Sequence, residues 1–234
     1  MFWYTDWTYI VLVLPAVILA LIAQARVNSV FTKYSKISSK RGFTGAQAAR
    51  RVLDANGLSN VRIERVSGKL TDHYDPRANV IRLSDATHDS TSAAAIGVAA
   101  HEAGHAVQHA TGYLPIKVRA AIIPLTNIGS RLAVPLIILG IFLSYYGEQF
   151  LSIAYLGVIA FSLSAVFQLV TLPTEFNASR RALEAVENYN VLDSEEIGQM
   201  KKVLSAAAMT YVAALAVSLT QLLRLLLMVN RRRR

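Results

Sequence analysis

The chain has 234 residues, carries a net charge of +9 and contains no cysteine. Without cysteine it has neither a disulfide framework nor thiolate ligands, so a transition metal would have to be held by histidine and carboxylate groups. No motif of basic and aromatic residues for nucleic-acid recognition accompanies the positive charge, and we expect no nucleic-acid partner. We assign the charge to membrane topology and to attraction by anionic lipid head groups.

An uncharged apolar run, Tyr9–Ala25, predicts a first transmembrane helix. The aromatic residues that lead into it resemble the belt found at membrane interfaces, and they are Trp3, Tyr4, Trp7 and Tyr9. A cleaved secretory signal peptide is the alternative, but no Lys or Arg precedes the run, and Gln24-Ala25-Arg26 is a poor cleavage site. The basic segment 27–40 is expected to follow the membrane surface as a linker.

A short helix and two short strands are predicted next. Thr44 can cap a helix over residues 46–56, which Gly57 can end. Val61–Val66 alternates apolar and charged residues, as a half-buried strand does, and Asn79–Leu83 predicts a second strand.

The stretch Ser67–Pro76 between these strands is interpreted as a loop. This order of elements is typical of a small zincin-like α+β unit, in which an edge strand can pair with an extended substrate. We assign that role to Val80–Leu83, with an ordinary structural strand as the alternative.

The pentapeptide His101-Glu102-Ala103-Gly104-His105 is the segment that points most directly to chemistry. It lies within a predicted helix, 92–110, for which Ser90 or Thr91 is the expected cap. Residues four apart share a helix face, so both imidazoles can reach one zinc ion. Glu102 lies beside that point, where it can take a proton from the water that the metal activates. The pattern therefore predicts a zinc-dependent peptidase.

Two apolar runs, Leu132–Gly147 and Phe150–Leu172, flank the turn Tyr145–Gln149 and predict a transmembrane hairpin, since each approaches the roughly 20 residues that cross a bilayer. A fourth run, Ala206–Asn230, contains Arg224, whose side chain can extend to the interface from near the helix end. Buried core helices are the alternative, but so short a chain has too little polar surface to cover four of them.

A catalytic zinc site needs a third protein ligand, and Glu175 is the candidate because a helix restarts there directly after the third apolar run. An acidic residue in a first helical turn, favoured by the helix dipole, is the alternative interpretation. His109 continues the four-residue series, but lies about 12 Å along the axis from His101. His73 and His88 are further candidates for the third position.

Basic residues predict the orientation. Fifteen Lys and Arg lie between Arg26 and Arg131 and four more between Arg180 and Lys202, whereas the turn 145–149 has none. The positive-inside rule then places the active site in the cytoplasm and the amino terminus outside. The four arginines 231–234 oppose this assignment. Either the more numerous charges elsewhere determine the orientation, or the last apolar run does not fully cross the membrane and lies partly within the catalytic core or the interface.

Four stretches together resemble the bacterial YugP family of membrane-bound neutral zinc metallopeptidases, over nearly the whole chain. They are Asp72-His73-Tyr74-Asp75-Pro76, Arg82-Leu83-Ser84, the segment 98–108 and the segment 172–179. The layout is also similar to the HtpX-like and prenyl-protein-processing membrane peptidases, in which a hairpin separates the His pair from a Glu ligand. The resemblance implies His101, His105 and Glu175 as ligands and Glu102 as base. The chain departs from those relatives at Ser179, where they carry Asp.

The predicted fold is an α-helical integral membrane protein with a small zincin-like α+β catalytic unit and about four transmembrane helices. In chain order we expect a first transmembrane helix at 1–25, a cytoplasmic zincin-like segment at 26–131, a transmembrane hairpin at 132–172, a cytoplasmic segment with the third ligand at 173–205, and an apolar helix with a basic tail at 206–234.

The predicted reaction is hydrolysis of peptide bonds in membrane-associated proteins, with Zn²⁺ as cofactor, at the bacterial cell membrane. The oxyanion needs a further donor, for which Tyr211, His73 and Arg180 are candidates; an interfacial tyrosine is the alternative for Tyr211. A non-catalytic zinc-containing scaffold that binds partner helices through Gly140 and Gly157 is the second hypothesis. The sequence indicates neither the physiological substrate nor the oligomeric state.

Overall fold

The computed structural model describes residues 7–232, so the predicted interfacial residues Trp3 and Tyr4 and the last two arginines lie outside the described residues. The chain divides into two compact units. The helical unit comprises Met1–Ala23, Val118–Leu172 and Thr210–Arg234, and the mixed unit comprises Gln24–Lys117 and Pro173–Met209.

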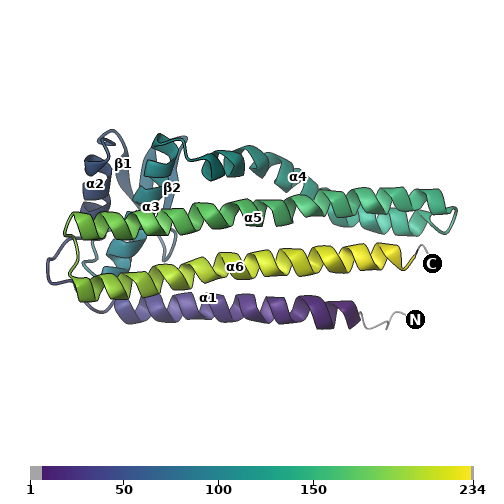
Figure 1. The fold of residues 1–234 in the computed structure, drawn as a ribbon, viewed down its shortest axis with the longest axis horizontal. Coiled ribbons are helices and arrows are strands. Elements are labelled where there is room, and N and C mark those ends of the chain that lie inside the picture. Colours follow the sequence, from purple (N-terminus) through teal and green to yellow (C-terminus); the bar gives the residue numbers. More distant parts are fainter. Residues whose placement is uncertain (1–6, 233–234) are drawn as a thin grey trace. The chain divides into compact units, whose positions relative to one another are not determined.

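The described chain is mostly helical and has four helices long and apolar enough to cross a membrane, as predicted. The first is a π-helical turn, Tyr9–Val13, continued by α1, Leu14–Tyr34. The others are α4, Leu114–Leu143, then α5, Leu151–Asn188, and α6, Ser194–Asn230, with a short 3₁₀ turn, Glu148–Phe150, before α5 (Figure 1).

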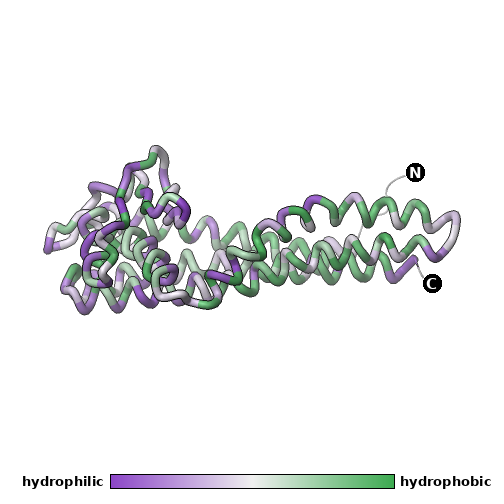
Figure 2. Tube along the Cα trace, turned by 90° about the horizontal axis from the view of Figure 1, so that it is seen from above, coloured by the Kyte–Doolittle hydropathy of each residue, from purple (hydrophilic) through white to green (hydrophobic). Residues whose placement is uncertain are grey.

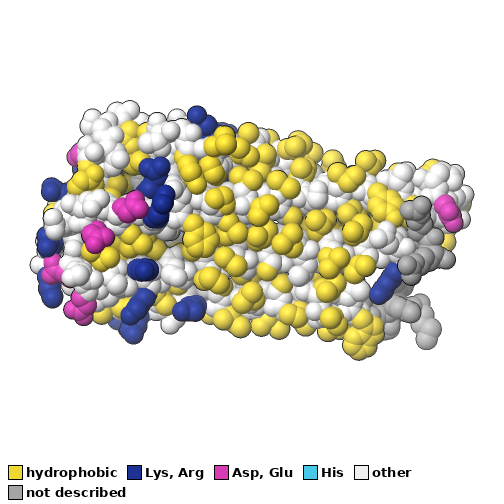
Figure 3. Space-filling view, viewed as in Figure 1, with side chains coloured by type: hydrophobic (Ala, Val, Ile, Leu, Met, Phe, Trp, Pro, Cys, Tyr) yellow, Lys and Arg dark blue, Asp and Glu magenta, His cyan; other side chains and the backbone are white. Residues whose placement is uncertain are grey.

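Composition differs sharply between the units. Hydrophobic residues follow the trace of the helical unit over most of its length, and hydrophilic ones are concentrated in the mixed unit (Figure 2). Apolar side chains cover the visible face of the helical unit, whereas most of the visible charged side chains lie on the mixed unit (Figure 3). An apolar exterior of this kind is stable in hydrocarbon and not in water.

Small residues let α4 and α5 approach closely inside the helical unit. A Cβ atom at Gly140 would overlap the backbone of Ala154, and one at Gly157 would lie 2.7 Å from the carbonyl oxygen of Ala133. Both glycines therefore pack within the chain's own hairpin. The prediction that they form a free face for partner helices is wrong, because their surfaces are already covered.

The carboxyl end of α6 lies at the same end of the helical unit as the turn between α4 and α5. The guanidinium of Arg232 is 4.9 Å from the ring centre of Tyr145, and the Tyr155 hydroxyl donates a hydrogen bond to Asn230 Oδ1 at 2.7 Å. The last helix thus extends along this unit as far as the hairpin does. Both alternatives for the terminal arginines stay open as predictions.

The mixed unit begins with the last turns of α1, which run on to Tyr34. The prediction of a surface linker from residue 27 is therefore wrong for 27–34, where Phe31 and Tyr34 are buried and hold the segment in place. Next comes α2, Gly45–Ala55, which Thr44 caps as predicted, in a reciprocal pair with Gln47. Gly57 adopts the positive φ that ends a helix.

A three-stranded sheet follows, with β1 at Arg62–Val66, β2 at His73–Asp75 and β3 at Val80–Ser84. The strand order is β1-β3-β2, with β1 parallel and β2 antiparallel to β3. Two predictions are wrong here. The stretch predicted as a loop contains β2. The strand predicted to pair with substrate, β3, is central and is paired on both edges, so β2 is an edge strand instead.

The central helix α3, Ala93–Ala110, is buried along most of its length. Its cap is Ser92, whose hydroxyl accepts a hydrogen bond from Ala95 N–H. The predicted caps, Ser90 and Thr91, lie one or two residues too early. Ser90 instead accepts a hydrogen bond from the backbone N–H of Ser92. The core around it includes Leu53 from α2, Ile81 from β3, and Ala182 and Met200 from α5 and α6. Small alanine side chains let these elements approach α3 closely, which makes it a rigid support for a site.

Candidate metal centre

His101 and His105 lie one turn apart on α3, in the buried middle of the mixed unit, and His105 is only 9% exposed. Their ring centres are 4.7 Å apart. Gly104, between them in the pentapeptide, faces α5, and a Cβ there would lie 2.8 Å from the carbonyl oxygen of Ala178. The glycine therefore allows α5 to approach the helix that carries the two imidazoles.

Glu175 comes from α5 and is 2% exposed. Its Oε2 atom lies 3.2 Å from His101 Nε2 and 3.5 Å from His105 Nε2. Ligands of a tetrahedral zinc at 2.0–2.1 Å from the metal are about 3.4 Å apart, which matches both separations. Within residues 7–232, these three side chains form a group whose candidate ligand atoms lie within 4.8 Å of one another. The donor set and its spacing thus fit zinc.

The other ring nitrogen of each histidine has a partner of its own. His101 Nδ1 lies 3.2 Å from the hydroxyl of Ser179, the position at which the resembled peptidases carry Asp, and His105 Nδ1 lies 3.0 Å from Gln108 Oε1. Such contacts orient the rings of metal-binding histidines and leave Nε2 to face the metal. Sequence reasoning missed Gln108; the available signal was its position three residues after His105, on the same helix face.

The electrostatics of the group favour a cation. Burial alone would lower the pKa of His105, but the hydrogen bond with Glu175 and the charges of Glu102 and Glu175 outweigh it, and the pKa is raised above its usual 6.5. The site therefore stabilises positive charge at the position of the imidazole. A divalent ion can satisfy the same negative field.

Glu102, the predicted base, points from α3 toward the edge of the sheet. Its Oε2 atom accepts a hydrogen bond from the backbone N–H of Tyr74 at 2.9 Å. Tyr74 is the middle residue of β2, so this carboxylate is held against the edge strand. The contact joins the candidate base to a backbone that can also pair with an extended chain.

The remaining sequence candidates lie elsewhere. His73 is exposed at the start of β2, with Nδ1 2.9 Å from the carbonyl oxygen of Thr71. His88 contacts Asp89, and burial together with Arg65 lowers its pKa. The His109 ring is tilted against the ring of Tyr74, with ring centres 5.5 Å apart. None of these three histidines belongs to the group of candidate ligand atoms formed by the described residues.

The other two proposed oxyanion donors are in different surroundings. Arg180 is exposed beside Glu184, 3.8 Å away. Tyr211 lies on α6 in the helical unit, whereas the group of candidate ligands lies in the mixed unit.

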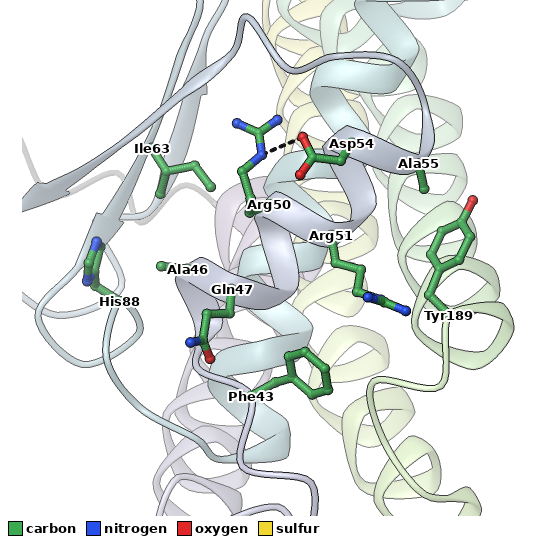
Figure 4. A pocket seen from close by; sticks show the side chains of 10 residues that line it. All are labelled: Phe43, Ala46, Gln47, Arg50, Arg51, Asp54, Ala55, Ile63, His88 and Tyr189. Carbon is green, nitrogen blue, oxygen red and sulfur yellow. Dashed lines mark ion pairs between the residues drawn. The ribbon is translucent and has the colours of Figure 1, made fainter.

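A hollow of about 670 Å³ lies along α2, and its lining does not include the candidate metal ligands on α3 and α5. Its lining includes Phe43, Arg51 and Tyr189, and within it Arg50 pairs with Asp54 (Figure 4). His88, one of the other candidates for the third position, lines it, but His101, His105 and Glu175 do not. The functional site is therefore defined by its donor atoms and not by the size of a cavity.

Comparison with known proteins agrees with this chemistry. The profile of a family described as "Putative neutral zinc metallopeptidase" matches residues 9–230. The chain belongs to this family. Zinc is accordingly the cofactor, in agreement with the donor set. A relative from Bacillus subtilis (strain 168), named "Putative membrane protease YugP", is 48% identical over 216 residues, which cover 92% of this chain and 94% of the relative. No solved structure matches the chain. The family predicted from the sequence is thus confirmed.

Proposed function

We propose that this member of the zinc metallopeptidase family is an active endopeptidase that hydrolyses peptide bonds beside the membrane. His101, His105 and Glu175 would hold the zinc ion. The observation that carries the proposal is the convergence of these three donors within 4.8 Å of one another, with Glu175 3.2 and 3.5 Å from the two imidazoles, next to a carboxylate that is not one of them. A purely structural zinc site has no need of Glu102.

When bound, zinc supplies a Lewis acid that polarises a carbonyl group and makes water acidic enough to lose a proton near neutral pH. Glu102 accepts that proton as the water oxygen attacks the scissile carbonyl, and then delivers it to the leaving amine. The new C–O bond to the water oxygen remains while the C–N bond breaks, so one water molecule is consumed for each peptide bond that is hydrolysed. The backbone N–H of Tyr74 keeps the Glu102 carboxylate in position through a hydrogen bond.

The edge strand β2 is the proposed docking strand for substrate, in place of β3. An extended peptide can add to an exposed sheet edge through main-chain hydrogen bonds. The Tyr74 N–H that now donates to Glu102 lies on that strand. Main-chain recognition of this kind suits unfolded segments or loops, which is consistent with a role in membrane-protein processing or quality control.

His73 remains the proposed donor to the oxyanion. Because the contact of His73 Nδ1 with the Thr71 carbonyl requires a proton on Nδ1, its Nε2 can donate only when the ring is doubly protonated.

We also propose a bacterial plasma-membrane location with the active site in the cytoplasm, on the basis of the nineteen Lys and Arg between residues 26 and 202. The chain has no cysteine, so a single introduced cysteine at Lys40 reports its own accessibility. We expect no labelling by an impermeant thiol reagent in intact cells. Efficient labelling would reverse the orientation.

The decisive test compares the detergent-purified parent with Glu102→Gln and with Glu187→Gln, an exposed glutamate of the same unit. We expect Glu102→Gln to bind zinc normally but to cleave a denatured protein at least about a hundredfold more slowly, since general base catalysis contributes roughly that much. The parent and the control should be equally active, and a chelator should stop both. Equal activity in the Glu102 variant would favour the non-catalytic scaffold.

A further inference from the structure

Gln108 is completely buried on α3, three residues after His105. Glutamine is mostly an exposed residue, because each polar atom of its carboxamide needs a partner when it is buried. Here the partners are present. Oε1 lies 3.0 Å from His105 Nδ1, and Nε2 donates to the Thr174 carbonyl oxygen at 2.8 Å and to Asn177 Oδ1 at 3.0 Å.

These partners determine which way the carboxamide faces. The Thr174 carbonyl can only accept a hydrogen bond. Asn177 presents its oxygen, because Arg181 Nε, which can only donate, binds that same atom at 2.8 Å. The amide nitrogen of Gln108 must therefore face α5. Its oxygen is left facing His105, where it can only accept.

A fixed acceptor next to Nδ1 favours one form of the imidazole. Gln108 stabilises neutral His105 with its proton on Nδ1 and the lone pair of Nε2 toward Glu175 and His101, whereas the Glu175 carboxylate, which only accepts, competes for a proton on Nε2 when no metal is bound. Zinc needs the form in which the lone pair of Nε2 is free. Ser179 beside His101 is less selective, since a hydroxyl both donates and accepts and tolerates either ring form.

We propose that Gln108 is a positioning residue that holds His105 in the zinc-binding tautomer and ties α3 to the stretch of α5 that carries Glu175. This inference rests on the proposed function and deepens it. One side chain couples the orientation of one ligand to the placement of another. Removal of the acceptor would let the ring of His105 change tautomer or rotate away from the metal position.

The test uses the full chain in detergent and two substitutions of similar size. Gln108→Met removes the acceptor, whereas Gln108→Glu keeps an oxygen opposite His105 Nδ1. Zinc affinity is measured by competition with a chromogenic chelator, and the melting temperature of the metal-free protein reports packing separately. We expect Gln108→Met, which loses both the acceptor and the tie to α5, to bind zinc about 10–100-fold more weakly, the loss typical of such outer contacts. Gln108→Glu loses only the tie to α5 and should lose clearly less affinity than Gln108→Met.

Parent-like zinc affinity in Gln108→Met, or an equal loss in Gln108→Glu, would overturn the inference. A second measurement holds even if Gln108→Met does not fold: ¹⁵N NMR of the histidine rings in metal-free Glu175→Ala protein above pH 8, in which the competing carboxylate is absent. We expect His105, assigned with His105→Asn, to carry its proton on Nδ1; a proton on Nε2 would refute the contact. If instead the parent binds no zinc while His105 has the expected tautomer, the proposed function fails and the Gln108 contact stands.

Discussion

The two units of this protein bury different kinds of surface and are stabilised differently. In the helical unit, Gly140 and Gly157 bring helix backbones into contact, and packing depends on shape. In the mixed unit, His105, Gln108 and Glu175 are buried together, and each needs a hydrogen-bonding or charged partner. Changes of side-chain size should therefore damage the helical unit, and changes of side-chain chemistry should damage the metal centre.

The largest effect is expected for Glu175→Ala. It removes a ligand and leaves both imidazoles without their anionic partner, so zinc affinity should fall by more than the about 10–100-fold that follows loss of an outer contact. Glu187→Ala, an exposed position on the same helix, is the control and should bind zinc as the parent does. Unchanged affinity in Glu175→Ala, measured by chelator competition, would remove it from the ligand set.

Gly140→Ala tests the other side of the comparison. The added Cβ would overlap the Ala154 backbone, which should lower the free energy of unfolding by about 1–3 kcal/mol. Gly198→Ala on α6 is the matched control: nothing lies within 4 Å of its Cβ position, and it should stabilise the helix by about 0.5–1 kcal/mol. Folded Gly140→Ala should keep the zinc affinity of the parent. A large loss of zinc from it would mean that the units are not independent.

The smallest expected effect is the response of zinc affinity to pH. A protonated imidazole cannot bind metal, and the raised pKa of His105 lets protons compete above pH 6.5. Zinc affinity should therefore rise as pH increases from 5.5 to beyond 6.5, by up to about tenfold per unit for each proton displaced. Gly140→Ala should show the same profile, because its change lies outside the metal centre. A flat profile over this range would exclude a histidine-bound ion.

Several features followed from local sequence rules. The apolar runs around residues 132–172 and 206–230 predicted helices because a long uncharged stretch satisfies its backbone only as a helix in lipid. The Thr44 cap and the pairing of His101 with His105 also follow from spacing along one helix. The ends of elements were less certain. Ser92, and not an earlier residue, caps α3.

By itself, the sequence determined that the protein has four helices long and apolar enough to cross a membrane and a pair of histidines spaced to bind one zinc ion, since both depend on patterns within a single segment. Only the tertiary structure decided that β2 is an edge strand, that Gly140 and Gly157 pack internally, and that Gln108 contacts His105. These features depend on contacts between residues far apart in the chain. Which partner satisfies a buried polar group is decided by packing, and no local pattern encodes it.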